Sequence, residues 1–163
     1  MASRVTISAR GEERVRSGHP WIYRSDVVDV HAQGADIVEV MGPRRRLLGR
    51  AFFSDQSQIP IRMLTQGDAL VDDALIRKRL QQAIAFRESL GIDATAYRLV
   101  HGEADLLPSL IVDRYGDYLV VQALSQGMDR LLPSITAMLV ELLAPLGILA
   151  RSEEHTSELQ SRF

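Results

Sequence analysis

The sequence predicts a mainly β N-terminal barrel of small size, followed by an α+β domain that the chain does not complete. Three observations support this prediction. The first 65 residues or so contain several short segments in which apolar and polar residues alternate, as in half-buried strands. The composition changes at 65–73, TQGDALVDD, and helical patterns then alternate with strand-like segments. The apolar run 138–150, MLVELLAPLGILA, passes directly into the polar ending 151–163, which suggests an interrupted fold.

The first part reads as short strands separated by turns. Strands are predicted at 4–8, 36–41, 46–54 and 59–65, the last two being joined by the polar loop DQSQ. A short helix is predicted at 11–17, ended by Gly18. The segment 41–46, MGPRRR, predicts a hairpin turn in which Gly42 and Pro43 take the unusual backbone angles. Many short strands with few helices indicate a small barrel or a partly open sheet.

The second part alternates helices and strands. Asp72 or Asp73 caps a predicted helix that ends at Gly91. The apolar residues expected near one face of this helix are Leu75, Leu80, Ala83, Ile84 and Leu90. A strand-like segment follows at 97–103, and then a hairpin over 110–124 with its tip at 115–117. A second helix is predicted at 128–147, with Pro133 in its first turns, followed by the strand-like segment 147–150.

Composition excludes several classes of protein. A hydrophobic fraction of 46% with 25% charged residues argues against intrinsic disorder. No secretory signal pattern is present, and Pro133, Glu141 and Pro145 interrupt the longest apolar stretch, so no membrane partner is expected. The chain has no cysteine, which excludes disulfides and thiolate chemistry and favours a cytoplasmic location. Residues 1–64 carry ten arginines against seven acids, whereas residues 65–150 carry seven basic and eleven acidic residues. This asymmetry directs the search for a nucleic-acid surface to the first part.

Two arginine-containing motifs are candidates for RNA contact. In GHPWIYRSD (18–26), the rings and Arg24 can form a stacking platform for unpaired bases; alternatively, Trp21 and Tyr23 fill a small core beside a bend at Pro20. The run 44–46, RRR, either binds phosphates from an exposed turn or is simply a solvated face. The predicted RNA-binding residues are Arg14, Arg16, His19, Arg24, Arg44, Arg45, Arg46 and Arg50.

A third motif, HGEAD (101–105), spaces His, Glu and Asp at alternate positions. Without a second ligand cluster, capping of turns and pairing with arginines such as Arg98 and Arg114 is favoured over metal binding. The sequence contains neither a glycine-rich strand-to-helix loop, nor a P-loop, nor a nucleophile elbow. The residues alone therefore indicate a non-catalytic binding module, with no catalytic, cofactor-binding or metal-binding residue.

Three motifs in succession resemble a known family. GHPWIYRSDV, GRAFFSDQSQIPIRML and YRLVHGEADLLPSLIVDRYGDYLVVQ are similar to the N-terminal half of bacterial class I S-adenosylmethionine-dependent ribosomal RNA methyltransferases, and most similar to the cytosine-C5 enzymes of the large subunit. The resemblance implies a PUA RNA-binding barrel at 1–66 and an α+β middle domain at 67–150. In the family pattern, GESDGLPGLIVDRY, glycines are common where Leu106 and Ser109 stand here, which weakens the expectation of the usual turn geometry.

The family's chemistry does not transfer to this chain. Methylation of cytosine at C5 normally requires a cysteine thiolate that adds at C6, and the chain has no cysteine. S-adenosyl-L-methionine is therefore implied only for a full-length parent, and the fragment is expected to be inactive. RNA, and ribosomal RNA in particular, is the expected partner. The rival interpretations are a stand-alone RNA-binding adaptor and a structural or oligomerisation module.

The ending RSEEHTSELQSRF (151–163) has an interpretation of its own. Its first eleven residues back-translate in frame to a common sequencing-library adapter, so we expect a non-native tail; the alternative is a natural polar C-terminus. On this interpretation the fold is cut near Ala150. Apolar side chains such as Leu139, Leu142 and Leu146 are then expected to be exposed and to promote self-association through residues 128–150.

Overall fold

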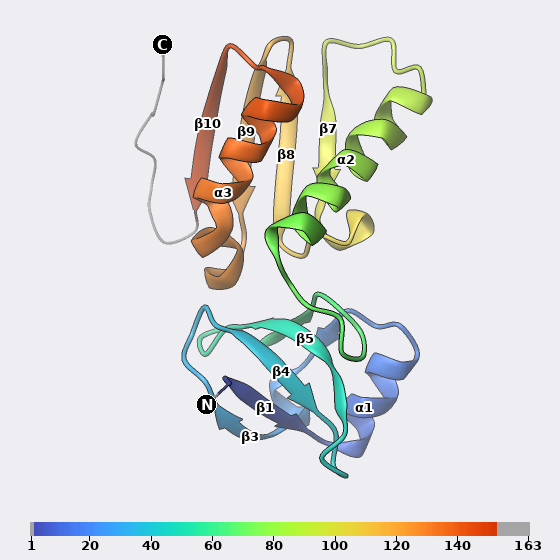
Figure 1. Ribbon diagram of the computed structural model, residues 1–163, viewed down its shortest axis with the longest axis vertical. Helices are drawn as coiled ribbons and strands as arrows, with labels where there is room; N and C mark the ends of the chain where they lie inside the picture. Colours follow the sequence, from blue (N-terminus) through green and yellow to red (C-terminus); the bar gives the residue numbers. More distant parts are fainter. Residues whose placement is uncertain (1, 153–163) are drawn as a thin grey trace. The chain divides into compact units, whose positions relative to one another are not determined.

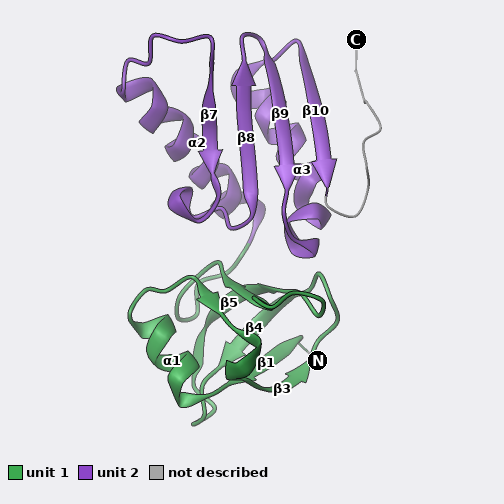
Figure 2. Ribbon diagram, turned by 180° about the vertical axis from the view of Figure 1, so that it is seen from behind, with its two compact units in different colours: residues 1–71 green, residues 72–163 purple. Residues whose placement is uncertain are grey.

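A computed structural model describes residues 2–152. The chain divides into two compact units, Met1–Val71 and Asp72–Phe163, drawn in green and purple in Figure 2. Residues 153–163 lie outside the described residues, and with them most of the segment interpreted as a non-native tail. Arg151 and Ser152, which begin that segment, continue the last strand of unit 2.

Unit 1 is built on a curled six-stranded sheet (Figure 1). The strand order is β2-β6-β5-β4-β1-β3, and every pairing is antiparallel except that of β1 with β4. The strands are β1 (Arg4–Ile7), β2 (Trp21–Ile22), β3 (Val27–His31), β4 (Ile37–Met41), β5 (Leu47–Phe53) and β6 (Ile61–Met63). The predictions at 4–8, 36–41, 46–54 and 59–65 therefore correspond to β1, β4, β5 and β6, the last of which is shorter than expected.

Alternation along these strands builds the core of unit 1. The buried residues Val5 and Ile7 of β1 lie beside Val38 and Val40 of β4, and each pair is separated by one less buried residue. Ile22 of β2, completely buried, closes the same core. Since side chains in a strand point to opposite faces in turn, this spacing places one face of each strand inward.

Helix α1 (Ala9–Arg16) follows β1 directly, and its start differs slightly from the prediction at 11–17. The Ser8 hydroxyl accepts a hydrogen bond from the Gly11 N–H, so a serine cap begins the helix. The helix ends at Ser17, and Gly18 then takes a φ of +83°, a left-handed conformation that favours glycine. The predicted stop is confirmed.

The hairpin turn between β4 and β5 is confirmed, but the residue with the unusual backbone angle is not the expected one. Arg45, rather than Gly42 or Pro43, has a positive φ, at +56°. Gly42 leaves room for a side chain of α1: a Cβ atom there would lie 2.5 Å from Oε2 of Glu12, so that carboxylate would have to move. The turn therefore packs directly against the first helix.

Unit 2 is a four-stranded sheet in the order β10-β9-β8-β7, with both long helices on one face (Figures 1 and 2). Its strands are β7 (Ala96–His101), β8 (Leu110–Tyr115), β9 (Tyr118–Ala123) and β10 (Gly147–Ser152). The helices are α2 (Asp73–Ser89) and α3 (Gln126–Leu143), and a short 3₁₀ helix, η2 (Gly102–Asp105), follows β7. A mainly β unit followed by an α+β unit is the predicted fold class, and it is confirmed.

The buried face of α2 differs in part from the prediction. Leu80 and Ala83 are buried as expected, but Ile76 is buried where Leu75 was expected. Leu90 is 56% exposed at the end of the helix, so its assignment to the apolar face was wrong. Asp72 caps the helix by accepting a hydrogen bond from the Leu75 N–H, and Gly91 follows the helix with a φ of +57°.

The turn after η2 keeps a left-handed backbone without glycine. Leu106 has a φ of +59° and Ser109 a φ of +60°, at the two positions where the family pattern usually has glycine. Leu106 is largely exposed, whereas Ser109 is buried with its hydroxyl 2.6 Å from that of Ser125. A non-glycine residue in this region is strained, so two side chains here adopt a conformation that costs free energy.

Helix α3 buries part of the segment that was expected to be exposed. Leu139 is completely buried, so the prediction of its exposure was wrong. Val140 and Leu146 are 50% and 64% exposed, in line with the expectation for Leu146. Strand β10 pairs in parallel with β9, and α3 is the crossover helix between these two strands. Within residues 2–152, no helix is both long and apolar enough to cross a membrane.

Candidate nucleic-acid interface

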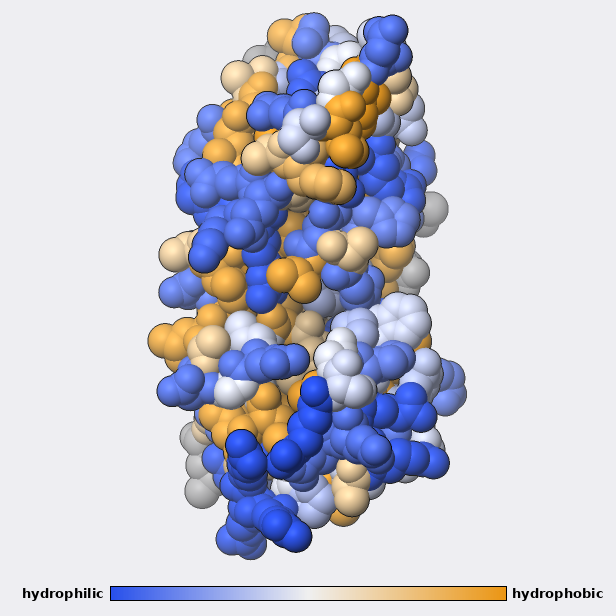
Figure 3. Space-filling view, turned by 90° about the vertical axis from the view of Figure 1, so that its right-hand side faces the viewer, coloured by the Kyte–Doolittle hydropathy of each residue, from blue (hydrophilic) through white to orange (hydrophobic). Residues whose placement is uncertain are grey.

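Hydrophilic side chains cover much of the face of unit 1 that carries α1 (Figure 3). Helix α1 itself has Arg10, Arg14 and Arg16, with the last two in its final turn. The sheet supplies further arginines from the β4–β5 turn and from β5. The contacts of each guanidinium group decide which of them remain available for a ligand.

The β4–β5 turn exposes three consecutive arginines. Arg44, Arg45 and Arg46 are all exposed. Within residues 2–152 their side chains form no ion pair or hydrogen bond, whereas the other arginines of unit 1 each have a partner. A cluster of unneutralised guanidinium groups is suited to bind phosphate, because each offers several N–H donors in a fixed plane.

A groove of about 430 Å³ separates α1 from this turn. One wall is formed by Glu12, Glu13 and Arg16 of α1, and the other by Pro43, Arg44 and Arg46. Arg16 donates from Nε to Oε1 of Glu12 at 2.9 Å, one helical turn away, and its Nη2 donates to the same oxygen. The groove therefore combines two arginines without a described partner, Arg44 and Arg46, with the paired Glu12 and Arg16 and the exposed Glu13.

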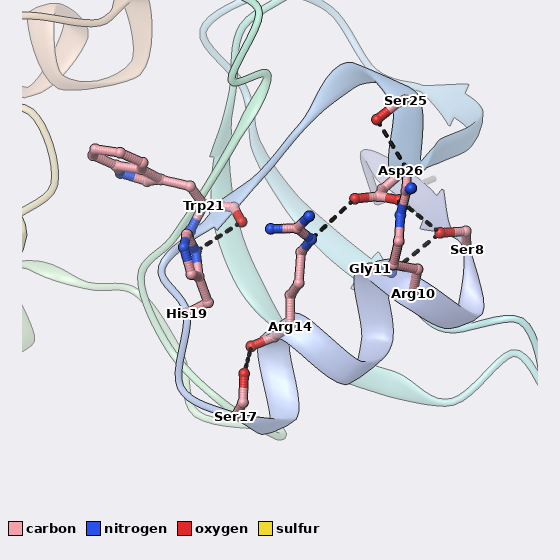
Figure 4. Close-up of polar contacts among 9 residues, drawn as sticks. All are labelled: Ser8, Arg10, Gly11, Arg14, Ser17, His19, Trp21, Ser25 and Asp26. Atoms are coloured by element: carbon pink, nitrogen blue, oxygen red, sulfur yellow. Dashed lines mark hydrogen bonds and ion pairs between the residues drawn. The ribbon is translucent and has the colours of Figure 1, made fainter.

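Asp26 organises the opposite side of α1 (Figure 4). Its carboxylate is only 1% exposed and accepts hydrogen bonds from Arg10 Nε at 2.6 Å and from the Ser8 hydroxyl at 3.2 Å. Arg14 Nε lies 3.3 Å from the second oxygen of Asp26. The Arg14 guanidinium also lies over the Tyr23 ring, 5.0 Å from its centroid, so that it stacks as well as pairs.

The aromatic residues of GHPWIYRSD form a half-buried cluster. The His19 ring lies 6.2 Å from Trp21 and 6.3 Å from Tyr23, and Trp21 donates its backbone N–H to His19 Nδ1. Ile22, the residue between the two larger rings, occupies the core. The alternative that Trp21 and Tyr23 fill the core is therefore wrong, because the strand alternation turns Ile22 inward in their place.

Two predicted contact residues hold loops. Arg24 Nη2 donates to the backbone oxygens of Asp55 and Ser57, both at 2.7 Å. Arg50 Nη1 donates to the backbone oxygens of Asp68 and Ala69, at 2.7 and 2.8 Å. These bonds engage part of each guanidinium group, and Arg50 also pairs with Glu39, with Nη2 3.4 Å from the carboxylate. RNA contact by Arg24 and Arg50 stays a prediction.

In unit 2, HGEAD forms an ion-pair anchor. Arg87 of α2 holds Asp105 with two hydrogen bonds, at 2.5 and 2.8 Å, and the His101 N–H donates to the same carboxylate. Burial alone would raise the pKa of Asp105, but hydrogen bonds from Arg87 and from His101 hold the pKa below its ordinary value. No group of three metal-ligating side chains occurs among the described residues.

The expected pairing of this motif with an arginine is confirmed, but the two arginines named for it were wrong. Arg98 binds Asp113 on the neighbouring strand, with its Nε 2.8 Å from the carboxylate, and Arg114 donates to the backbone oxygen of Gly116. Arg87, fourteen positions before HGEAD begins, is the true partner. Arg87 lies in the last turn of α2 and its side chain is only 11% exposed, which the sequence pattern does not reveal.

Comparison with known proteins agrees with this geometry. Residues 5–66 match the family of PUA-like domains. The chain is 35% identical over 158 residues to ribosomal RNA large subunit methyltransferase I of Tolumonas auensis, covering 94% of this chain and 40% of that protein. Its counterpart in Aliivibrio fischeri is 37% identical over 152 residues, covering 89% of this chain and 38% of that protein. The chain thus spans about two-fifths of the length of the curated relatives it matches.

Two solved structures share the fold. A protein of Streptococcus mutans assigned as a SAM-dependent methyltransferase superposes with a TM-score of 0.82 at 16% identity, covering 98% of this chain and 45% of that one. SMU.776, assigned as a methyltransferase and crystallised with SAH, gives a TM-score of 0.83 at 16% identity, with 98% and 44% covered. At this identity the likeness concerns the fold alone. Unit 1 is a PUA-like curled half-barrel, followed by an α+β unit.

Proposed function

We propose that the chain is the RNA-recognition portion of an S-adenosylmethionine-dependent ribosomal RNA methyltransferase, and that unit 1 makes the contacts with RNA. One observation carries the proposal: Arg44, Arg45 and Arg46 are exposed together on a turn of a PUA-like domain, and no described side chain neutralises them. Guanidinium groups in this state attract the phosphate backbone. The names of the curated relatives favour ribosomal RNA as the nucleic acid.

The finer assignments belong to the same proposal. Residues 1–66 are the RNA-binding barrel, residues 67–150 the middle domain of the enzyme, and the site of action is the cytoplasm. The resemblance favours cytosine C5 as the target of the parent. Secondary contacts come from the remaining candidates, which are Arg14, Arg16, His19, Arg24 and Arg50.

The cofactor belongs to the parent protein, because the residues described here do not fit it. Class I methyltransferases bind the cofactor at a glycine-rich loop between a strand and a helix. In this chain the short junction after β1 is Ser8, and the junction after β9 is Leu124 and Ser125. The chain also has no cysteine to act as a nucleophile. These residues therefore carry no step of methyl transfer.

Salt-dependent binding tests the proposal. The full chain is titrated into fluorescently labelled single-stranded fragments of large-subunit ribosomal RNA, and anisotropy is measured at about 50 and about 200 mM salt. The triple variant Arg44→Ser, Arg45→Ser, Arg46→Ser is expected to bind at least about tenfold more weakly at low salt. Because each phosphate contact on a single strand contributes about 0.7 to the slope of log K against log salt, the slope should fall by about 2.

Lys78→Ser supplies the control, since Lys78 is an exposed cation on α2 of unit 2. It should leave both affinity and salt slope close to those of the wild type. Absence of binding by the wild type at low salt would contradict the proposal. So would a triple variant that binds as tightly as the control.

A self-association module is the second candidate, and one observation favours it. Val140 and Leu146 are 50% and 64% exposed near the end of α3, a surface that can be covered by a second copy of the chain. An adaptor that binds RNA without a catalytic partner is the third. Concentration-dependent sedimentation without RNA affinity would select the self-association module over either RNA-binding function.

A further inference from the structure

The groove between α1 and the β4–β5 turn has two chemically different walls. Arg44 and Arg46 form the cationic wall, and the other is lined by Glu13 together with Glu12, whose charge Arg16 balances. Its volume of about 430 Å³ falls in the range of pockets that hold small ligands. A site built only to attract phosphate would have no reason to carry carboxylates, because they repel the same ligand.

The two carboxylates differ in their contacts. Glu12 accepts two hydrogen bonds from Arg16, and its Oε2 lies against Gly42 at the foot of the turn. Glu12 is thus already engaged within α1. Glu13 is exposed, and among the described residues its carboxylate has no partner. An ionised carboxylate accepts hydrogen bonds only, so Glu13 can accept one from a ligand that carries a donor.

We propose that this groove binds one ribonucleotide of the RNA chain, with its phosphate on Arg44 and Arg46 and its ribose 2′-hydroxyl donating to Glu13. This inference rests on the proposed RNA-binding function and adds to it a residue that distinguishes RNA from DNA. A nucleotide carries an anion and a hydroxyl donor on adjacent groups, which matches one cationic and one acceptor wall. The 2′-hydroxyl is the group by which proteins tell RNA from DNA at a given site.

Oligouridine and oligodeoxyuridine test the inference, because they share a base without an exocyclic amine and differ only in the 2′-hydroxyl. Both are titrated into the full chain at low salt and followed by anisotropy. The wild type should bind oligouridine at least roughly tenfold more tightly than oligodeoxyuridine, as expected for one hydrogen bond to a charged group. Glu13→Ala should remove this preference by weakening oligouridine binding, while binding of oligodeoxyuridine is kept or strengthened by the loss of a negative charge.

Asp29→Ala is the matched control, because it removes one exposed carboxylate of unit 1 from β3, outside the groove. It should raise the affinity for both oligonucleotides equally and keep the preference. Equal binding of the two by the wild type, or an unchanged preference in Glu13→Ala, overturns the inference while the proposed function stands. Failure of the wild type to bind either one at low salt overturns both.

Discussion

Asp26→Asn is the substitution that tests the architecture of unit 1 most directly. The carboxylate is 1% exposed and lies between the start of α1 and the strand β3, where it joins Ser8, Arg10 and Arg14. Asparagine has nearly the same shape, so the core loses no volume. What changes is the charge, and one oxygen acceptor becomes an N–H donor.

The magnitude follows from the three contacts. The oxygen that serves Ser8 and Arg10 can be kept by asparagine, but both of its contacts lose their charge-assisted character. The second oxygen, facing Arg14 Nε at 3.3 Å, becomes an amide nitrogen that meets another donor. Breaking a buried ion pair costs about 3–5 kcal/mol when the partner stays buried. Here the side chains of Arg10 and Arg14 are 61% and 35% exposed and regain water, so we expect a loss of about 2–3 kcal/mol.

Tryptophan fluorescence follows unit 1 selectively. Trp21 is the only tryptophan of the chain and lies on β2. In urea, with a slope of about 1–2 kcal/mol per M for a small domain, the midpoint of the Trp21 transition should fall by about 1–3 M. The helix signal in circular dichroism, which comes mainly from α2 and α3, should keep the transition of unit 2.

The control is Asp29→Asn, an exposed aspartate of the same unit whose carboxylate pairs with His31 near the surface. Surface pairs of this kind contribute little, so the free energy of unfolding of this variant should stay within about 0.5 kcal/mol of the wild type. If Asp26→Asn behaves like this control, Asp26 does not organise α1. The account of Arg10 and Arg14 as structurally held arginines would then be refuted.

Two further predictions concern unit 2. Leu106→Gly should stabilise unit 2 by about 0.5–1 kcal/mol, because the strain of a left-handed leucine is larger than the extra entropy that glycine gives the unfolded chain. Leu90 has a φ of −77°, so Leu90→Gly relieves no strain and should destabilise the unit. Thermal unfolding followed by circular dichroism compares the two variants. The lowered pKa of Asp105 implies a contribution to stability that is fully present above its ordinary value of about 3.8 and is lost as pH falls through the folded-state pKa. Asp105→Asn should be less stable near neutrality and show a smaller loss on acidification; an unchanged pH profile would contradict this.

Local patterns predicted most of the elements. The strands β1, β4 and β5 and the helix α2 follow from alternation, spacing and the cap at Asp72, all of which act within a few residues. The errors arose where contacts between distant parts of the chain determine whether a side chain is buried. The exposure of Leu139 was mispredicted because the local pattern cannot show that α3 packs against β9 and β10, and Leu139 is completely buried.

The sequence could predict which arginines belong to the candidate site, but not which of them are free to bind a ligand. The sequence identifies the arginines of unit 1 equally well, and nothing local separates Arg45 from Arg50. The fold separates them, because Arg50 reaches two backbone oxygens that follow β6, whereas the β4–β5 turn extends beyond such partners. Glu13 was overlooked for the same reason, since only the packing of Gly42 against α1 places this glutamate opposite the arginines.

The sequence by itself determined the order of the elements, the excess of positive charge in the first part and the absence of a cysteine. These properties depend on residue identity and short-range spacing. The tertiary structure alone decided which charges are satisfied, because neutralisation depends on distance in space. It brought Asp26 to Arg10 and Arg14, and Arg87 to Asp105, and it left Arg44, Arg45 and Arg46 on an exposed turn. The proposed contact with RNA depends on these three exposed arginines.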